Sequence, residues 1–518
     1  MKTVLAGLAL FAAAGVCTPS LAQSGLTFPM VDTGQTKCYG TRGGASWSCP
    51  KAGEDQFGQD ANYTKNPPKY QDNADGTVTD LVTGLMWEKD FQANVEWSSA
   101  PSMARRANTG GHNDWRVPTI KELYSLMRFD GATGNMGNMT STPSDAKPYM
   151  DTKVFNFEYP TDRGAKANNA NRFIDAQYVT STAYVGTTMG GSPTFFGVNF
   201  ADGRIKGYPQ RPMMRSGGYY LRLVRGNPAF GQNDFVEAGH DIVLDKATGL
   251  EWMQLDTGHP DLKSSVSGTK KGDGQLDWVE SLAYCETASY GGKSDWRLPN
   301  AKELQAILDY TRAPQTTRTA AIDPIFYTTE ITDETGKPNF AGYWTSTTHL
   351  DGRYPGTDAI VVYFGEALGA FKSPGGGQMG GSMPERRQQN MSGPRGNQGP
   401  PPMGGGGGMM PPPHMMGPGG QGGMMPPPHM MGQQGGPQGD MQGGPRGGPG
   451  SMSRPRMGGG SGPSGSADKE DFQDVHGAGA QRSDPKVGSV DQYPIWGHGP
   501  QGDVRRVFNH VRCVRDAG

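Results

Sequence analysis

The residues best suited to metal chemistry lie in a Gly/Pro-rich segment of the C-terminal half. The nonapeptide Met-Met-Pro-Pro-Pro-His-Met-Met-Gly occurs twice, at 409–417 and 424–432. Thioether and imidazole groups favour Cu(I) over hard cations, so one hypothesis is copper binding by this tract. The expected ligands are His414, Met415, Met416, His429, Met430 and Met431. Flexible methionine clusters are also generic adhesive surfaces, so a linker without metal is the alternative.

Basic side chains suggest a second chemistry, the recognition of anions. Arg204 and Lys206 follow one Tyr/Phe-rich segment, and Arg505, Arg506 and Arg512 lie close to the C-terminus. The fork-shaped guanidinium group suits sulfate and carboxylate. The pattern therefore suggests a surface for acidic polysaccharide, and we favour the alternative of a solvated strand face without a ligand.

Two further motifs combine hydroxyl, aromatic and charged groups. The Thr-Ser-Thr runs at 180–182 and 345–347 have no recognisable His/Asp partners and no Gly-x-Ser-x-Gly elbow, so we expect no nucleophile there. The Asp-Trp-Arg runs at 114–116 and 295–297 offer an aromatic face and an ion pair to a sugar. We favour the interpretation that the tryptophan belongs to the core and the charges brace a loop.

These residues belong to a unit that the chain contains twice. Thr-Gly-Leu-x-Trp ends at Trp87 and again at Trp252, and a longer block from Gly111 to Leu123 returns from Gly292 to Leu304. Further matched pairs follow in the same order: Trp97 with Trp278, 178–182 with 343–347, and 221–225 with 511–515. Several matched blocks in one order indicate a tandem repeat.

Each copy predicts the same short elements. A strand, a turn at Thr-Gly and a strand ending in tryptophan come first, and a helix begins at Trp97 or Trp278. A second helix begins after Thr119 or Asn300, where a glutamate three residues later completes a capping box. Short strands rich in Tyr, Phe, Val and Thr close the unit, which indicates an α+β fold with few helices.

The second copy is expected to be discontinuous. Between Phe371 and Val511 lies a long stretch of Gly, Pro, Met, Gln and Arg with almost no branched or aromatic residues, too little apolar mass to offset the ordering entropy. The expected organisation is a signal peptide at 1–22, an N-terminal disulfide-looped segment at 23–70, a first domain at 71–228, a second domain at 238–372 plus 486–518, and a disordered insert at 373–485.

The cysteines of the processed chain predict two disulfides. Cys38, Cys49, Cys285 and Cys513 allow three pairings. Alignment of the copies places Ala104 opposite Cys285 and Leu223 opposite Cys513, so both cysteines of the second copy are replaced together in the first. We therefore expect Cys285–Cys513 to close the split domain and Cys38–Cys49 to form a local loop.

The N-terminus indicates export. An apolar run from Val4 to Val16 follows Lys2, and Ser-Leu-Ala precedes Gln23, as in a signal peptide. We expect no transmembrane segment after it, and the formal net charge of −2 gives no drive toward nucleic acid. The sequence does not indicate an oligomeric state. The periplasm, the cell surface and the medium all remain possible locations.

Taken together, the motifs resemble the Lcl C-terminal domain family, named for the Legionella collagen-like adhesin. The resemblance rests on Thr-Gly-Leu-x-Trp, Asp-Trp-Arg-Val/Leu-Pro-x-x-Lys-Glu-Leu and Tyr-Val/Trp-Thr-Ser-Thr, in two tandem copies. It implies domains similar to C-type lectin-like and formylglycine-generating-enzyme folds, and adhesion to sulfated polysaccharides in some members. A fold-level similarity licenses no activity by itself.

The expected function is that of an exported, non-catalytic binding or adhesion protein that recognises acidic polysaccharide or a cell-surface protein, without a cofactor. The first alternative is a periplasmic copper-binding protein that uses the Met/His tract. An enzyme related to the formylglycine fold is the third hypothesis.

Overall fold

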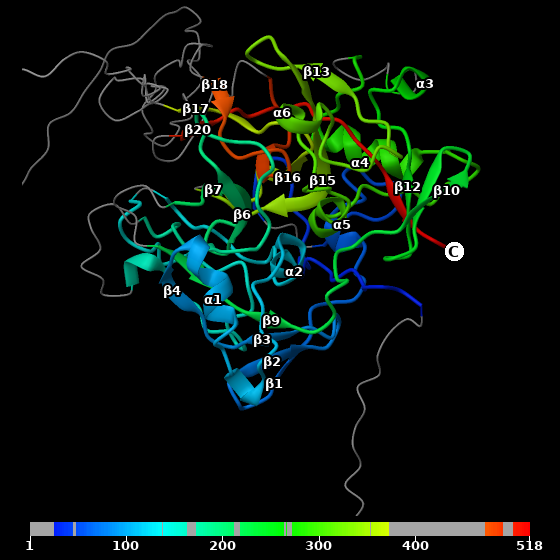
Figure 1. Ribbon diagram of the computed structural model, residues 1–518. Coiled ribbons are helices and arrows are strands. Elements are labelled where there is room, and N and C mark those ends of the chain that lie inside the picture. The colour runs from blue at the N-terminus through cyan, green and yellow to red at the C-terminus, as the bar shows by residue number, and fades with distance from the viewer. Residues whose placement is uncertain are drawn as a thin grey trace, which may run out of the picture. The chain divides into compact units, whose positions relative to one another are not determined.

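The computed structural model describes residues 25–44, 48–136, 138–162, 172–211, 218–263, 266, 272–352, 354–371, 472–489 and 501–518. The expected signal peptide and the expected copper ligands lie outside these residues. The described chain is a sheet-rich α+β structure in which helices are short (Figure 1).

The first repeat follows a short N-terminal region that contains η1 (Asp60–Asn62) and β1 (Tyr70–Asp72). Its elements are β2 (Thr77–Asp80), β3 (Met86–Glu88), β4 (Gln92–Val95), η2 (Trp97–Ser99), α1 (Ala100–Ala104), η3 (Thr109–Gly111), α2 (Ile120–Ser125), η4 (Pro160–Asp162), β5 (Gln177–Tyr178), β6 (Thr194–Asn199), β7 (Arg204–Pro209), β8 (Tyr219–Leu221) and β9 (Val224–Arg225).

The second repeat has the same order of elements with additions. Its elements are β10 (Phe235–Gly239), β11 (Ile242–Asp245), β12 (Leu250–Met253), α3 (Pro260–Lys263), α4 (Trp278–Thr287), α5 (Ala301–Ala306), α6 (Pro314–Thr317), β13 (Glu330–Thr332), β14 (Pro338–Phe340), β15 (Gly342–His349), β16 (Asp358–Tyr363), β17 (Leu368–Phe371), β18 (Phe472–Asp474), β19 (Gln481–Pro485), β20 (Gln501–Asp503) and β21 (Val514–Asp516).

A small antiparallel sheet opens and closes each repeat. The orders are β1-β2-β3-β9 and β10-β11-β12-β21, so the closing strand of each copy pairs with the strand that carries the tryptophan. The registers agree, because Trp87 lies opposite Val224 and Trp252 lies opposite Val514. The turns before these tryptophan strands contain Gly84 at φ 72° and Gly249 at φ 71°, a left-handed conformation that glycine adopts without steric cost. The predicted strand, turn and strand are confirmed.

The second expected helix is also confirmed in both copies. Thr119 caps α2 and Asn300 caps α5, and each helix has a reciprocal capping box with the glutamate at its third position. α2 and α5 pack against each other (Figure 1). The first expected helix differs between copies: α4 runs from Trp278 to Thr287, whereas Trp97 begins a 3-10 turn that leads into the short α1.

A larger sheet joins the two repeats. Its order is β15-β16-β19-β7-β6-β5-β8-β4, with strands of the second copy at one end and of the first at the other. The junction is antiparallel, with Gln481 of β19 opposite Ile205 of β7. The largest apolar cluster likewise draws on both copies, including Trp87, Leu123, Trp252 and Leu304. The repeats therefore share a sheet and a core.

The boundary of the expected insert needs correction. We expected the second domain to resume at 486, but β18 and β19 lie between 472 and 485. β18 pairs with β17, and β19 pairs with β16 along its whole length. The folded part of the second repeat therefore includes residues 472–485, whose polar composition concealed the strands. The rest of the expected insert lies outside the described residues.

The segment before the first repeat packs on both copies. The ring of Phe28 lies 4.9 Å from that of Phe230. The Gln35 side chain donates to the carbonyl oxygens of Phe129 and Thr348, at 3.0 and 2.9 Å. This segment is therefore part of the common core as well as a disulfide loop.

Both expected disulfides are present. Cys38 is bonded to Cys49, and Cys285 of α4 is bonded to Cys513, immediately before β21. Among the helices of the described ranges, none is both long and apolar enough to cross a lipid bilayer. Disulfides persist in oxidising compartments, so the two bridges are consistent with an extracellular protein.

Candidate functional site

The Asp-Trp-Arg motif makes the same internal contacts in both copies. The indole N–H of Trp115 donates to Thr109 O and that of Trp296 to Tyr290 O, both at 3.1 Å. Arg116 and Arg297 each form a two-pronged ion pair with the helix-capping glutamate, Glu122 or Glu303. Both tryptophans are buried, so the motif positions a helix and offers no open aromatic face.

The threonines of the Thr-Ser-Thr motif likewise make internal contacts. The hydroxyl of Thr345 donates to Ile360 O at 3.0 Å, and that of Thr180 donates to Phe196 O. The hydroxyl oxygens of Thr182 and Thr347 accept the first backbone N–H of α2 and α5, at 3.0 and 2.9 Å. The hydroxyls therefore connect a strand to a helix start in each repeat.

A buried arginine recurs at the closing strand. Arg222 donates to the carbonyl oxygens of Glu88 and Asn156, each at 2.6 Å, and its guanidinium lies over the Phe155 ring. Arg512 donates to Met253 O at 2.7 Å and to Tyr327 O. Since five N–H donors fix the directions of the bonds, one arginine holds several backbone segments in place.

The expected basic surface is not present at the residues chosen for it. Arg505 pairs with Asp358, Arg506 with Glu334, and Arg512 is buried. Across the full set of Arg204, Lys206, Arg505, Arg506 and Arg512, no side chain is more than 18 % exposed. These cations have internal acceptors in the fold, which neither the ligand hypothesis nor the solvated-face alternative anticipated.

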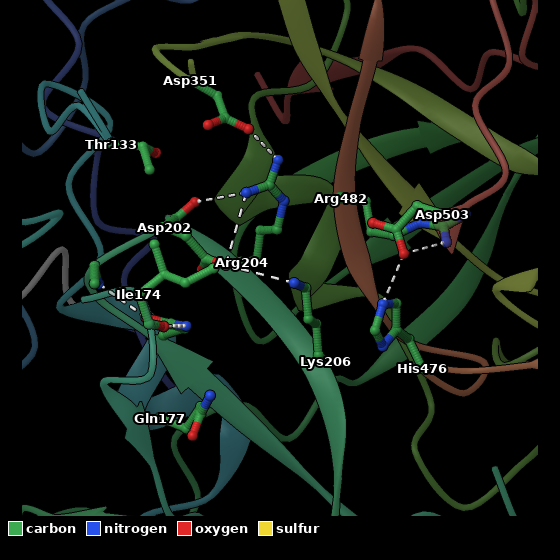
Figure 2. A network of polar contacts seen from close by, with 12 residues as sticks. Thr133, Ile174, Gln177, Asp202, Arg204, Lys206, Asp351, His476, Arg482 and Asp503 are labelled. Atoms are coloured by element: carbon green, nitrogen blue, oxygen red, sulfur yellow. Dashed lines mark hydrogen bonds and ion pairs between the residues drawn. The ribbon is translucent and has the colours of Figure 1, made fainter. Parts of the chain in front are cut away.

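Arg204 and Lys206 instead belong to a polar network at the junction of the repeats (Figure 2). Arg204 projects from β7 and forms ion pairs with Asp202 of its own hairpin, at 3.7 Å, and with Asp351 of the second repeat. Lys206 lies 3.4 Å from the same Asp202 carboxylate. The pKa of Arg204 is raised by the two carboxylates in spite of its burial. The network therefore joins the repeats by charge as well as by the sheet.

A hydroxyl and an imidazole meet in the same region. His349 Nδ1 lies 2.8 Å from Ser483 Oγ, and Nε2 lies 2.9 Å from Asp202 O. Burial, followed by the charge of Arg204, lowers the pKa of His349 to about 3. A weakly basic imidazole without solvent access is poorly suited to general base catalysis near neutral pH. The contact of His349 with Asp202 O instead links the second repeat to the first.

A second histidine lies beside this network. His476 Nε2 lies 2.8 Å from Asp503 Oδ1, and Arg482 approaches the same oxygen at 3.3 Å (Figure 2). Burial lowers the pKa of His476 to about 4, whereas Arg482 and His476 hold the pKa of Asp503 well below its usual range. Nδ1 of His476 is buried and has no hydrogen-bond partner among the described residues. The neutral imidazole therefore serves as a link between β18 and β20.

Sequence reasoning identified Arg204 and Lys206 but missed their partners. The Asp202-Gly203 pair could have indicated one partner, because Asp-Gly is typical of the tight turn of a hairpin. Gly203 adopts φ 68° in the turn between β6 and β7, and this turn places Asp202 beside Arg204. Asp351, His476 and Asp503 lie in segments without a matched counterpart in the first copy. Within the described part of the chain, no group of three or more His, Cys, Asp or Glu side chains is arranged to hold a metal ion.

Comparison with known proteins identifies one family. The model of the Lcl C-terminal domain matches residues 76–225 and 241–379, which together make up more than half of the 518 residues. The matched segments contain both copies of the recurring motifs except the closing block of the second copy, 511–515. No curated protein and no solved structure matches this chain.

Proposed function

The chain belongs to the Lcl C-terminal domain family, and from this premise we propose that it is an exported, non-catalytic binding protein of the adhesin type. The observation that carries the proposal is that the recurring polar side chains make contacts inside the protein. The arginines, threonines and glutamates that could supply a repeated active site make the same internal contacts in both copies. They form a common framework, so recognition is assigned to the outer surface of the two repeats.

The proposed ligand is a polysaccharide or protein on a cell surface. The family includes an adhesin, the disulfides suit an oxidising compartment, and the sequence begins with a signal-peptide pattern. An acidic polysaccharide would have to meet other cations than the five described above, for example the exposed Arg105 and Arg106 that follow α1.

We further propose that each repeat follows a C-type lectin-like course. The link from α4 to the C-terminal strand through Cys285 and Cys513 supports this proposal, as does the pairing of the closing strand of each copy with the early strand that carries the tryptophan, β9 with β3 and β21 with β12.

The structure allows a sharp test of where binding resides. β17 ends at Phe371 and β18 begins at Phe472, and the two strands are antiparallel neighbours. The intervening residues 372–471 can therefore be replaced by a short Gly/Ser turn. Binding of the mature protein and of this loop-free variant to immobilised sulfated and uncharged polysaccharides is measured across a salt series. We expect salt-sensitive binding that survives the replacement. Absence of binding to both types of polysaccharide by both proteins would contradict a polysaccharide adhesin.

The repeated Met/His nonapeptide supports a second candidate, copper binding. Titration of both proteins with Cu(I) separates it from the first. A copper-binding protein would lose its high-affinity sites with residues 372–471, whereas polysaccharide binding by the repeats would be unchanged.

A further inference from the structure

An amine, a carboxamide and a carboxylate meet where the first repeat leads into the second. Lys121 of α2 places its Nζ 2.8 Å from Oδ1 of Asn233, which lies shortly before β10. The other end of the same amide, Nδ2 of Asn233, donates to Oδ2 of Asp245 at 2.8 Å. The three side chains come from a helix of one copy, the connecting segment and a strand of the other.

The amine is within reach of the amide carbon. Because a C=O bond is about 1.2 Å long, Nζ of Lys121 lies no more than about 4 Å from Cγ of Asn233. Reacting atoms in a near-attack arrangement are about 3–3.5 Å apart, so a small rotation of the lysine is sufficient. The backbone is held equally close: Gly231 O accepts from the same Nζ at 3.0 Å, and a Cβ on Gly231 would lie 2.9 Å from Cβ of Lys121.

The surroundings favour the nucleophilic form of the lysine. Lys121 lines a small, mainly apolar pocket together with Phe28, Tyr124 and Phe230. Burial lowers the pKa of Lys121 to about 8, against the opposing charges of Asp245 and Asp309. A neutral amine is the form that attacks a carbonyl carbon, and it is therefore a substantial fraction at mildly alkaline pH.

Hydrogen bonds fix the Asp245 carboxylate beside the amide of Asn233. Asp245 is 1 % exposed, and Oδ2 accepts from Thr248 Oγ1 as well as from Asn233. Oδ1 accepts the backbone N–H groups of Asp234 and Ala247. A carboxylate fixed beside the leaving nitrogen is suited to proton transfer between the two nitrogens.

We propose that Lys121 and Asn233 form an intramolecular isopeptide bond. Nζ of Lys121 attacks Cγ of Asn233, the bond from Cγ to Nδ2 breaks, and Nδ2 leaves as ammonia. The proton lost from Nζ passes through the Asp245 carboxylate to Nδ2. One amide replaces another, so no oxidant, reductant or cofactor is required. The product ties α2 of the first repeat to the segment that enters the second.

The chain contains its own comparison at Lys302, the counterpart of Lys121 in the second copy. Lys302 is 3 % exposed, and burial lowers its pKa to about 7. Its Nζ donates to the backbone oxygens of Asp32 and Ser125, at 2.9 and 2.8 Å. Attack on either carbonyl would cut the main chain and leave an amine tethered beside it, whereas attack on Asn233 releases ammonia that diffuses away. A buried lysine alone is therefore insufficient, and we expect Lys302 to keep its amine.

Mass spectrometry of the reduced mature protein tests the proposal. The intact mass should be lower than the sequence mass by one ammonia, and the deficit should be absent in Lys121→Arg and in Asn233→Ala. Circular dichroism of both variants checks that they fold. A deficit that persists in Lys121→Arg, or a full mass in the unsubstituted protein, would overturn the bond.

Peptide mapping separates the bond from a succinimide at Asn233-Asp234, which also releases ammonia. The isopeptide predicts a branched tryptic peptide that contains both Lys121 and Asn233, no cleavage after Lys121, and normal cleavage after Lys302. Linear peptides for both residues would refute it, whatever the intact mass.

Discussion

At the scale of single residues, the recurring arginines are the side chains best suited to bind an anion, but they donate their hydrogen bonds to the backbone. Arg222 and Arg512 occupy equivalent positions and donate to carbonyl oxygens far away in sequence, such as Glu88 and Met253. The sequence showed that arginines recur, but it could not show their acceptors, because backbone carbonyls have no sequence signature. The same residues therefore supported an anion-binding hypothesis before the structure placed them inside.

Replacement of Arg222 tests this framework role. Arg222→Met keeps the length of the side chain but leaves the oxygens of Glu88, Lys89 and Asn156 without their donor. We expect the free energy of unfolding to fall by about 3 kcal/mol or more, measured by urea denaturation. The matched control is Arg105→Met at an exposed position, with an expected change within about 0.5 kcal/mol. Equal effects of the two substitutions would contradict the assignment.

A buried carboxyl group predicts a pH dependence of stability. Burial raises the pKa of Asp60 to about 7, and Asp32 adds to this effect, whereas the Thr347 and Thr33 hydroxyls oppose it. The folded state therefore binds the proton more tightly than the unfolded state, whose Asp pKa is about 3.9. Between these two values the contribution of Asp60 to the free energy of unfolding falls as pH rises, by about 1.4 kcal/mol per unit of pKa difference.

Asp60→Asn removes this titration and retains a group that hydrogen-bonds Thr33 and Thr347. We expect the free energy of unfolding of the variant, relative to that of the unsubstituted protein, to increase from pH 4 to pH 7 in denaturant titrations. A difference that stays constant over this range would show that Asp60 does not titrate there.

At the scale of elements, local patterns were the reliable guide. Two of these patterns are the capping boxes at Thr119 and Asn300 and the turns at Gly84 and Gly249, which depend on neighbours within a few residues. The structure has each of them in both copies. β19 was missed because Gln481–Pro485 is a polar segment, although it is buried between β16 and β7. The burial of such a strand depends on partners that are distant in the sequence.

The disulfide between α4 and the C-terminal strand can be tested with the residues that replace it in the first copy. Cys285→Ala with Cys513→Leu restores the residues found at the equivalent positions of the first copy, Ala104 and Leu223. Both side chains remain apolar in a buried cluster, so the principal loss is the cross-link. We expect the variant to fold with a free energy of unfolding lower by about 2–5 kcal/mol. An unchanged denaturation midpoint would show that the bridge does not stabilise the split repeat.

At the scale of the whole folded unit, the two repeats are coupled by more than their connecting segment. The sheet junction at Ile205 and Gln481, the ion pair of Arg204 with Asp351 and the shared apolar cluster all cross between copies. The sequence predicted two separate domains of ordinary size, because the matched motifs define the two copies but do not show any contact between them. Gln481 and Asp351 lie in segments without a matched counterpart in the first copy, so internal comparison could not indicate the sheet junction or the ion pair. Equivalent residues such as Leu123 and Leu304 were matched in the sequence, but the match did not show that they share one cluster.

Differential scanning calorimetry of the loop-free variant tests this coupling, and with it the central claim that the recurring residues build one framework. We expect one transition, with equal calorimetric and van't Hoff enthalpies, that moves to lower temperature both with Arg222→Met in the first repeat and with Arg512→Met in the second. Two transitions, each shifted by the substitution in its own repeat alone, would contradict the account.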